Sequence, residues 1–375
     1  MTTPNLIPVL DPNPLPAPYW VFETLLLVTF FLHILAMNFM LGGAVLALVA
    51  KWFPGKRKNG NRMFSDITRK LPVLLPAVIT LGIAPLLFVQ VLYGQFFYTS
   101  SIVIAWPWFL VLALLATAYY GFYFVSYKNQ RYPRWAGRVL LLSVVFVLTI
   151  AFMFSNNITL SQTPARWGAK YFADPTGWNL NLSDPTLVPR YLHFMIAAVA
   201  VGGLLLVLIA WSRWKQDLEY AREVFQFGGK TFMYATMAEL VVGVWFLIAL
   251  PGQISRLFLG GNPLATILLI IGIGGAIGAI IVMSKALRNQ NIRLAGYGVL
   301  GIMSVVILSM VCIRELVRIA YLKPYFHPEQ FAVKTQWSVF PLFLVLFIGG
   351  VILWFVMLKR YGLFASRKQS EESHP

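Results

Sequence analysis

Residues 188–211 read VPRYLHFMIAAVAVGGLLLVLIAW, and the basic residues of this run are Arg190 and His193. The hydrocarbon core of a bilayer is about 30 Å thick, so a helix of about 20 apolar residues crosses it. Runs of the same character recur along the chain, at about 19–50, 72–95, 102–127, 137–158, 188–211, 230–251, 263–285, 294–318 and 336–358. The sequence therefore predicts an all-α fold, a polytopic integral membrane helix bundle with about nine transmembrane helices.

The composition supports the same fold class. Of the 375 residues, 59% are hydrophobic and 11% are charged, and the mean hydropathy is +0.73. A soluble domain carries about 25% charged residues, so this composition excludes a cytosolic, secreted or disordered protein. Cys312 is the one cysteine, which excludes a disulfide framework, a Cys-ligated zinc or iron–sulfur site, and covalent haem attachment through a C-x-x-C-H motif.

A single helical membrane domain over residues 1–365 is the simplest organisation of the chain. The connection at 159–187 is long and contains Asp-Pro and Trp-Gly turn signals, so we expect it to form a small cap over the membrane surface. Residues 366–375 read SRKQSEESHP and are expected to be a polar, disordered tail.

The charge of the chain is strongly positive, with 30 Lys and Arg against 13 Asp and Glu and a formal net charge of +17. The basic residues concentrate in every second connection, beginning with the one after the first span. The positive-inside rule then places the N-terminus outside and the C-terminus in the cytoplasm, which agrees with an odd number of spans. We therefore expect a lipid bilayer, and no nucleic acid, as the partner of this charge, in the cytoplasmic membrane of a bacterium or archaeon.

Ionisable side chains inside the spans are the first candidates for function. Each costs several kcal/mol in hydrocarbon unless it is paired or bound. His33 and His193 lie in predicted spans, and a neutral intramembrane histidine is a good axial ligand for haem iron. Small residues follow His193 and would let a flat macrocycle, or another helix, approach closely. The alternative is that both histidines form hydrogen bonds and that the small residues pack helices.

Other polar residues extend this set. Glu239 would ligate a metal, relay protons or bond a neighbouring helix, and Met237 offers a thioether but cannot share a helical face with Glu239. Arg314 and Arg318 share a face and would clamp haem propionates, or form an ion pair at the membrane interface.

At this point the chain resembles subunit I of the cytochrome bd quinol oxidases. The likeness lies in about nine spans with the N-terminus outside, a first-span histidine, and a fifth span that opens with a histidine followed by small residues. The fourth span ends NNITLSQTPARW, where Asn157, Gln162, Thr163 and Pro164 resemble a segment of that family. The stretch LGIAPLLFVQVLYGQFFY at 81–98 parallels it as well. The similarity covers most of the chain but is thin in identity, so it implies distant kinship.

The resemblance implies roles for individual residues. His193 would be an axial ligand of a low-spin haem b near the outer surface, and His33 the ligand of a second haem. Glu315 lies about two residues from the position of a glutamate ligand. The implied cofactors are one or more haem b groups, with two or three expected, and a quinone as substrate. Further pocket residues would be Glu239, Met237, Gln162 and Asn157, and the possible propionate partners would be Arg190, Arg256, Arg314 and Arg318.

The departures from the family matter equally. Its methionine ligand falls where this chain has Leu269, Ile270 and Ile271, and its two proton-path carboxylates fall near Gln90 and Gln95. Residues 321–325 stand where the family has a conserved signature. The family's long quinol-binding loop between spans six and seven corresponds in this chain to about a dozen residues around Arg256. Oxygen reduction needs protons delivered to a buried haem, usually by intramembrane carboxylates. Their loss favours electron transfer over oxygen chemistry.

Three functions are compatible with the sequence. The first is a b-type cytochrome subunit of a respiratory complex, an oxidoreductase component that moves electrons between membrane quinone and an extracytoplasmic carrier. Its partners would be other membrane subunits and a periplasmic c-type cytochrome. The second is a divergent bd-type terminal quinol oxidase that reduces oxygen. The third is a haem-free transporter or structural membrane subunit. The first accounts best for intramembrane histidines without the proton-path carboxylates.

Overall fold

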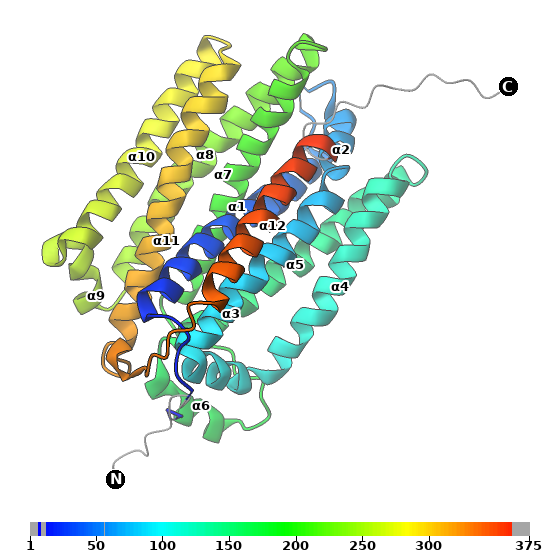
Figure 1. Ribbon diagram of the computed structural model, residues 1–375. Helices are drawn as coiled ribbons and strands as arrows, with labels where there is room; N and C mark the ends of the chain where they lie inside the picture. Colours follow the sequence, from blue (N-terminus) through cyan, green and yellow to red (C-terminus); the bar gives the residue numbers. More distant parts are fainter. Residues whose placement is uncertain (1–6, 9–12, 56, 362–375) are drawn as a thin grey trace.

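The computed structural model describes residues 7–8, 13–55 and 57–361 (Figure 1). The polar tail expected at 366–375, like the domain boundary at 365, lies outside the described residues. The long helices are α1 (Tyr19–Trp52), α3 (Leu71–Val103), α4 (Ala105–Lys128), α5 (Pro133–Ser161), α7 (Leu187–Arg213), α8 (Leu218–Ala249), α10 (Pro263–Arg288), α11 (Leu300–Leu322) and α12 (Val339–Tyr361). The shorter elements are α2 (Gly60–Thr68), η1 (Pro164–Arg166), α6 (Trp167–Ala173), α9 (Gly252–Arg256), η2 (Leu257–Gly261), η3 (Leu294–Val299) and η4 (Pro328–Gln330).

The prediction of an all-α membrane bundle is confirmed. Eight helices in the described part are long and apolar enough to cross a bilayer, and α12 supplies a further apolar helix. The boundaries differ where hydropathy is a poor guide. The span expected at 230–251 begins earlier, at Leu218, because the first turns of α8 are polar but helical, and the Asp217 side chain caps them by accepting a hydrogen bond from the Tyr220 amide. Likewise α3 continues to Val103 rather than ending near 95.

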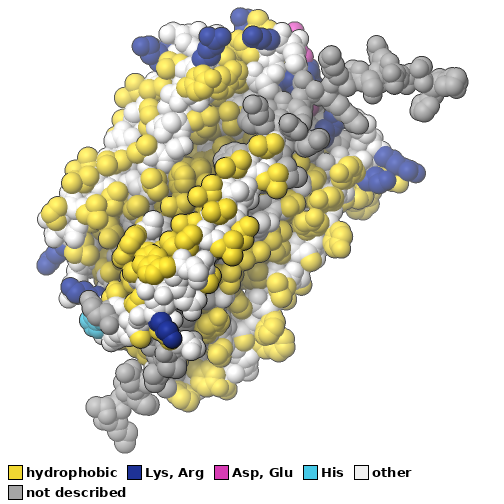
Figure 2. Space-filling model, in the orientation of Figure 1, with side chains coloured by type: hydrophobic (Ala, Val, Ile, Leu, Met, Phe, Trp, Pro, Cys, Tyr) yellow, Lys and Arg dark blue, Asp and Glu magenta, His cyan; other side chains and the backbone are white. Residues whose placement is uncertain are grey.

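The helices run alongside one another, with α1 between two groups (Figure 1). On one side α7 packs on α8 and α10 packs on α11, while on the other α3 lies against α1 and α4 against α5. The connections after α1, α4, α7 and α10 all lie at the upper end of the view in Figure 1. Figure 2 shows that most of the visible Lys and Arg side chains gather there, while hydrophobic side chains cover the middle of the bundle. We call this the basic end. It is the end that the positive-inside rule assigns to the cytoplasm.

The connection at 159–187 lies at the opposite end and contains η1 and α6 (Figure 1). Buried hydrogen bonds hold it to the end of α5. The Asn156 side-chain oxygen accepts from the Asn181 amide at 2.8 Å, and the Trp167 indole donates to the Leu160 carbonyl at 2.9 Å. Since these polar groups are satisfied within the protein, the connection has a defined fold over that end of the bundle.

Helices α1 and α7 cross with their backbones in close contact. A Cβ atom added at Gly202 would lie 2.5 Å from the carbonyl carbon of Gly42, and one added at Gly42 would overlap the carbonyl oxygen of Ala198. Both contacts are to backbone, which has no rotamer with which to move away. Glycine at these two positions therefore lets α1 and α7 pack directly on each other.

We predict that Gly202→Ala separates α1 from α7 and lowers stability by about 1–3 kcal/mol, as overpacking does in other cores. Thermal unfolding in detergent measures this as a lower Tm. Gly274→Ala is the matched control, because among the described residues nothing lies within 4 Å of a Cβ added at Gly274. Equal Tm values for the two variants would show that the crossing is not tight.

Candidate functional site

A largely apolar cavity of about 340 Å³ lies between α1, α7, α8, α10 and α11. Its volume falls in the range of small-molecule sites, roughly 300–1,000 Å³. The polar side chains that reach it are Asn38, Arg190, His193, Thr236, Glu239 and Arg314. It lies in the half of the bundle away from the basic end, because Arg190 and His193 stand in the first two turns of α7, close to the 159–187 connection.

The central polar contact of the cavity joins α7 to α8. The imidazole Nδ1 of His193 lies 2.9 Å from Oε1 of Glu239, and both side chains are mostly buried, 23% and 17% exposed. Gly243, one turn after Glu239, leaves room for the ring, since a Cβ there would lie 3.3 Å from Cε1 of His193. The contact is an ion-pair distance: among the described residues Nδ1 makes no hydrogen bond of good geometry, although it lies next to the carboxylate. In the described part of the chain no hydrogen bond engages Nε2 of His193, so that nitrogen is free to bind a ligand.

Two arginines flank this pair. Arg190 donates to Oε1 of Gln162 at 3.0 Å, and its guanidinium lies 5.0 Å from the centre of the Phe246 ring. Arg314 lies 4.1 Å from the ring centre of Phe30. These contacts orient both guanidinium groups, and neither one forms an ion pair with a carboxylate within the described residues.

Several buried polar atoms of the lining have no hydrogen-bond partner among the described residues. They are Oδ1 of Asn38, Nε of Arg190, Nδ1 of His193, Oε2 of Glu239 and Nε of Arg314. A buried polar group without a partner costs about 1–3 kcal/mol, and native proteins tolerate few of them. Five such atoms in one cavity favour it as the place where a ligand with acidic and polar groups would bind.

His33 does not line this cavity. Its Nδ1 lies 3.0 Å from the carbonyl oxygen of Val78 on α3, and a Cβ added at Gly82 would lie 2.8 Å from its Cε1 atom. On α1, the cavity is lined instead by Phe30, Ile34 and Asn38. The structure therefore separates the two candidate histidines, with His193 in the cavity and His33 between α1 and α3.

Glu315 and Arg318 belong to a second polar cluster, between α1, α3 and α11. Arg318 donates to both carboxylate oxygens of Glu315, at 3.1 and 2.8 Å, and the Tyr93 hydroxyl donates to Oε1 at 2.8 Å. The Tyr19 hydroxyl lies 2.8 Å from that of Tyr93. The helix is kinked at Tyr93, which has φ −129° and ψ 29°. The sequence left two interpretations open for Arg314 and Arg318, a clamp on haem propionates or an ion pair. In the structure Arg318 forms an ion pair with Glu315, and of the two arginines Arg314 alone lines the cavity.

The remaining candidates lie apart from the cavity. Asn157 donates to Oγ of Ser101 at 2.9 Å, and Gln162 contributes only through Arg190. Met237 is 43% exposed on α8, and Arg256 is exposed on α9. Met303 and Met310 of α11 line the cavity and were not among the sequence candidates. The sequence signal that could have identified them is their spacing of seven residues, which places both side chains on one face of the helix.

Comparisons with known proteins identify the fold. No protein-family model matches the chain, and no curated protein matches it. A solved structure, the bd oxidase from Geobacillus thermodenitrificans, matches with a TM-score of 0.70 at 14% identity, over 92% of this chain and 98% of that one. At this identity the likeness is one of fold, and it confirms the distant resemblance to bd-type oxidases at that level. The chain is an integral membrane protein with a bd-oxidase-like helical fold.

We predict that Arg318→Gln destabilises the fold by about 3–5 kcal/mol, because it leaves Glu315 buried without a compensating charge. The double variant Glu315→Gln with Arg318→Gln removes both charges and is expected to recover most of the loss. Thermal unfolding in detergent measures both, with Arg293→Gln on the exposed surface as the control. A single variant as stable as the parent would show that the pair carries no net stabilisation.

Proposed function

We propose that this chain is a b-type cytochrome subunit of a respiratory complex in a bacterial or archaeal cytoplasmic membrane. In this role it moves electrons between membrane quinone and a carrier outside that membrane. The observation that carries the proposal is the His193–Glu239 contact in an apolar cavity. Histidines that ligate a metal usually donate their other ring N–H to a carboxylate or a backbone carbonyl. Since Nδ1 lies next to the Glu239 carboxylate, Nε2 is the ring nitrogen left to bind a ligand in the cavity.

The residues present fit a haem. A macrocycle needs apolar walls, an axial imidazole and cationic partners for its propionates, and the cavity lining contains each of these. Arg190 and Arg314 are the cations, each with a buried Nε that has no hydrogen-bond partner among the described residues. The thioethers of Met303 and Met310 are further candidate ligands on the same lining. When bound, haem supplies reversible one-electron chemistry at a potential set by its ligands and surroundings.

The protein's own contribution is positioning and electrostatics. Glu239 orients the His193 ring. Cation–π contacts with the rings of Phe246 and Phe30 fix the guanidinium groups of Arg190 and Arg314. The apolar walls exclude water and keep the local dielectric low, so each charge near the cavity acts strongly on whatever binds there.

His33 is proposed as the ligand of a second haem. Its Nδ1 is engaged by the Val78 carbonyl, and the ring packs against Gly82, where a Cβ would lie 2.8 Å from Cε1. This is the same arrangement as at His193, with a backbone carbonyl in place of the carboxylate. The location of His193 in the half away from the basic end suits exchange with an extracytoplasmic partner such as a c-type cytochrome, and another membrane subunit is expected beside the chain.

The reduced-minus-oxidised spectrum of the purified protein tests the proposal. We predict a b-type α-band, which His193→Ala and His33→Ala each diminish by a distinct part. His327→Ala, in an exposed loop, is the matched control and retains the whole signal. Glu239→Gln is expected to retain haem but shift its midpoint potential, because the carboxylate no longer polarises the imidazole.

Other spectra would point elsewhere. An additional long-wavelength chlorin band would support the terminal oxidase. A folded preparation without haem would overturn the proposal and leave a transporter or structural subunit. A pyridine haemochrome assay gives the stoichiometry, which is expected to be about two if both histidines are ligands.

A further inference from the structure

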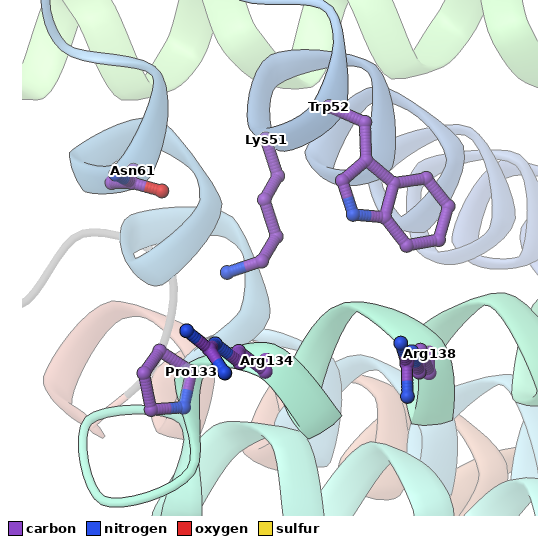
Figure 3. Close-up of a pocket in the computed structure, with 6 residues that line it drawn as sticks. All are labelled: Lys51, Trp52, Asn61, Pro133, Arg134 and Arg138. Carbon is purple, nitrogen blue, oxygen red and sulfur yellow. The ribbon is translucent and has the colours of Figure 1, made fainter.

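A second pocket, of about 540 Å³, lies at the basic end between α1, α2 and α5 (Figure 3). Its lining consists of Lys51, Trp52, Asn61, Pro133, Arg134 and Arg138. Figure 3 shows the Lys51 side chain extending from α1 toward Arg134 on α5, while the Trp52 indole lies over the same space beside Arg138. It shares no residue with the cavity of His193.

The charge of this pocket is uncompensated. Three of its six lining residues are cations and none is acidic. Within the described part of the chain, Lys51, Arg134 and Arg138 form no ion pair. The contacts found for two of them are to aromatic rings, with the Lys51 ammonium 4.3 Å from the Phe64 centre and the Arg138 guanidinium 5.5 Å from that of Trp135. Three like charges around one space repel one another, and a bound anion relieves that repulsion.

The walls of the pocket are fixed by packing. A Cβ added at Gly137 of α5 would lie 3.0 Å from the Trp52 indole, so this ring rests on the α5 backbone and ties the end of α1 to it. Arg134 and Arg138 lie one turn apart on α5 and therefore share a face. Tryptophans concentrate at the level of lipid headgroups. Trp52 and Trp135 thus set the depth of the pocket at the boundary between hydrocarbon and water.

We propose that this pocket binds the phosphate ester of an anionic membrane phospholipid. Its three cations are opposite in sign to the negative charge of such a headgroup, and basic pockets between transmembrane helices on the cytoplasmic side are suited to such headgroups. The lipid is favoured over a soluble phosphate because the pocket lies at the ends of α1 and α5, two helices long and apolar enough to cross a membrane, so that an acyl chain would lie along them. This inference is independent of the proposed redox function.

Native mass spectrometry of the full chain in detergent tests this inference, with phosphatidylglycerol, phosphatidylcholine and inorganic phosphate as the probes. We expect phosphatidylglycerol to be retained in preference to phosphatidylcholine. Its apparent affinity should fall about fivefold for each cation removed, and ~100-fold in Lys51→Gln with Arg134→Gln and Arg138→Gln. The matched control removes the same charge from another connection of the basic end, by Lys285→Gln, Arg288→Gln and Arg293→Gln.

The outcomes separate the sources of the phosphate. Equal loss of phosphatidylglycerol in the triple variant and in its control would overturn the site, because it would show a general effect of net charge. Binding of inorganic phosphate but not of phosphatidylglycerol would overturn the lipid assignment in favour of a soluble phosphate. If the triple variant unfolds, Arg134→Gln alone, at an exposed position, is expected to give the fivefold loss at an unchanged Tm.

Discussion

A carboxylate inside a membrane bundle is costly unless it is paired. Glu315 and Glu239, two acids on the transmembrane helices, meet this cost in different ways. Glu315 is saturated by the protein, since Arg318 contacts both of its oxygens and Tyr93 donates to one. Glu239 is half satisfied, with Oε1 close to His193 and Oε2 without a partner in the described part of the chain. The saturated acid has the environment of a structural ion pair. The half-satisfied acid, in a cavity with two incompletely bonded arginines, has the environment of a binding site.

The position of α1 explains why one helix contributes to two separate sites. The glycine crossing at Gly42 and Gly202 brings it directly onto α7, while its other side packs on α3. Adjacent residues of a helix point about 100° apart. His33 and Ile34 therefore face different neighbours, Val78 and Gly82 on α3 for the histidine and the cavity for the isoleucine. A ligand at His33 and a ligand at His193 would be separated by this helix and would have different surroundings.

The sequence predicts the spans and the polar candidates well because hydrophobic length and the cost of burying charge are local properties. It does not predict which candidates meet. The contact of His193 with Glu239 depends on how α7 and α8 are rotated against each other, which composition does not reveal. The same holds for Arg314 and Arg318, which share a helical stripe but diverge because Arg318 turns back to Glu315 on the same helix. The start of α8 was predicted too late in the sequence, because its first turns are polar. The helix begins at Leu218, after the cap formed by Asp217.

The two ends of the bundle have different chemistry. At the basic end, positive side chains stand around a pocket at headgroup depth, where water and lipid phosphates screen them. In the opposite half, the positive charges of Arg190 and Arg314 are buried beside aromatic rings, where screening is weak and an unpaired cation is costly. Cationic side chains thus have different roles at the two depths, at the membrane surface and inside the bundle. Exposed cations give a modest, salt-dependent attraction to a membrane surface. Buried cations need a specific anionic group within reach, and this need is the physical reason for proposing the cavity of His193 as a binding site.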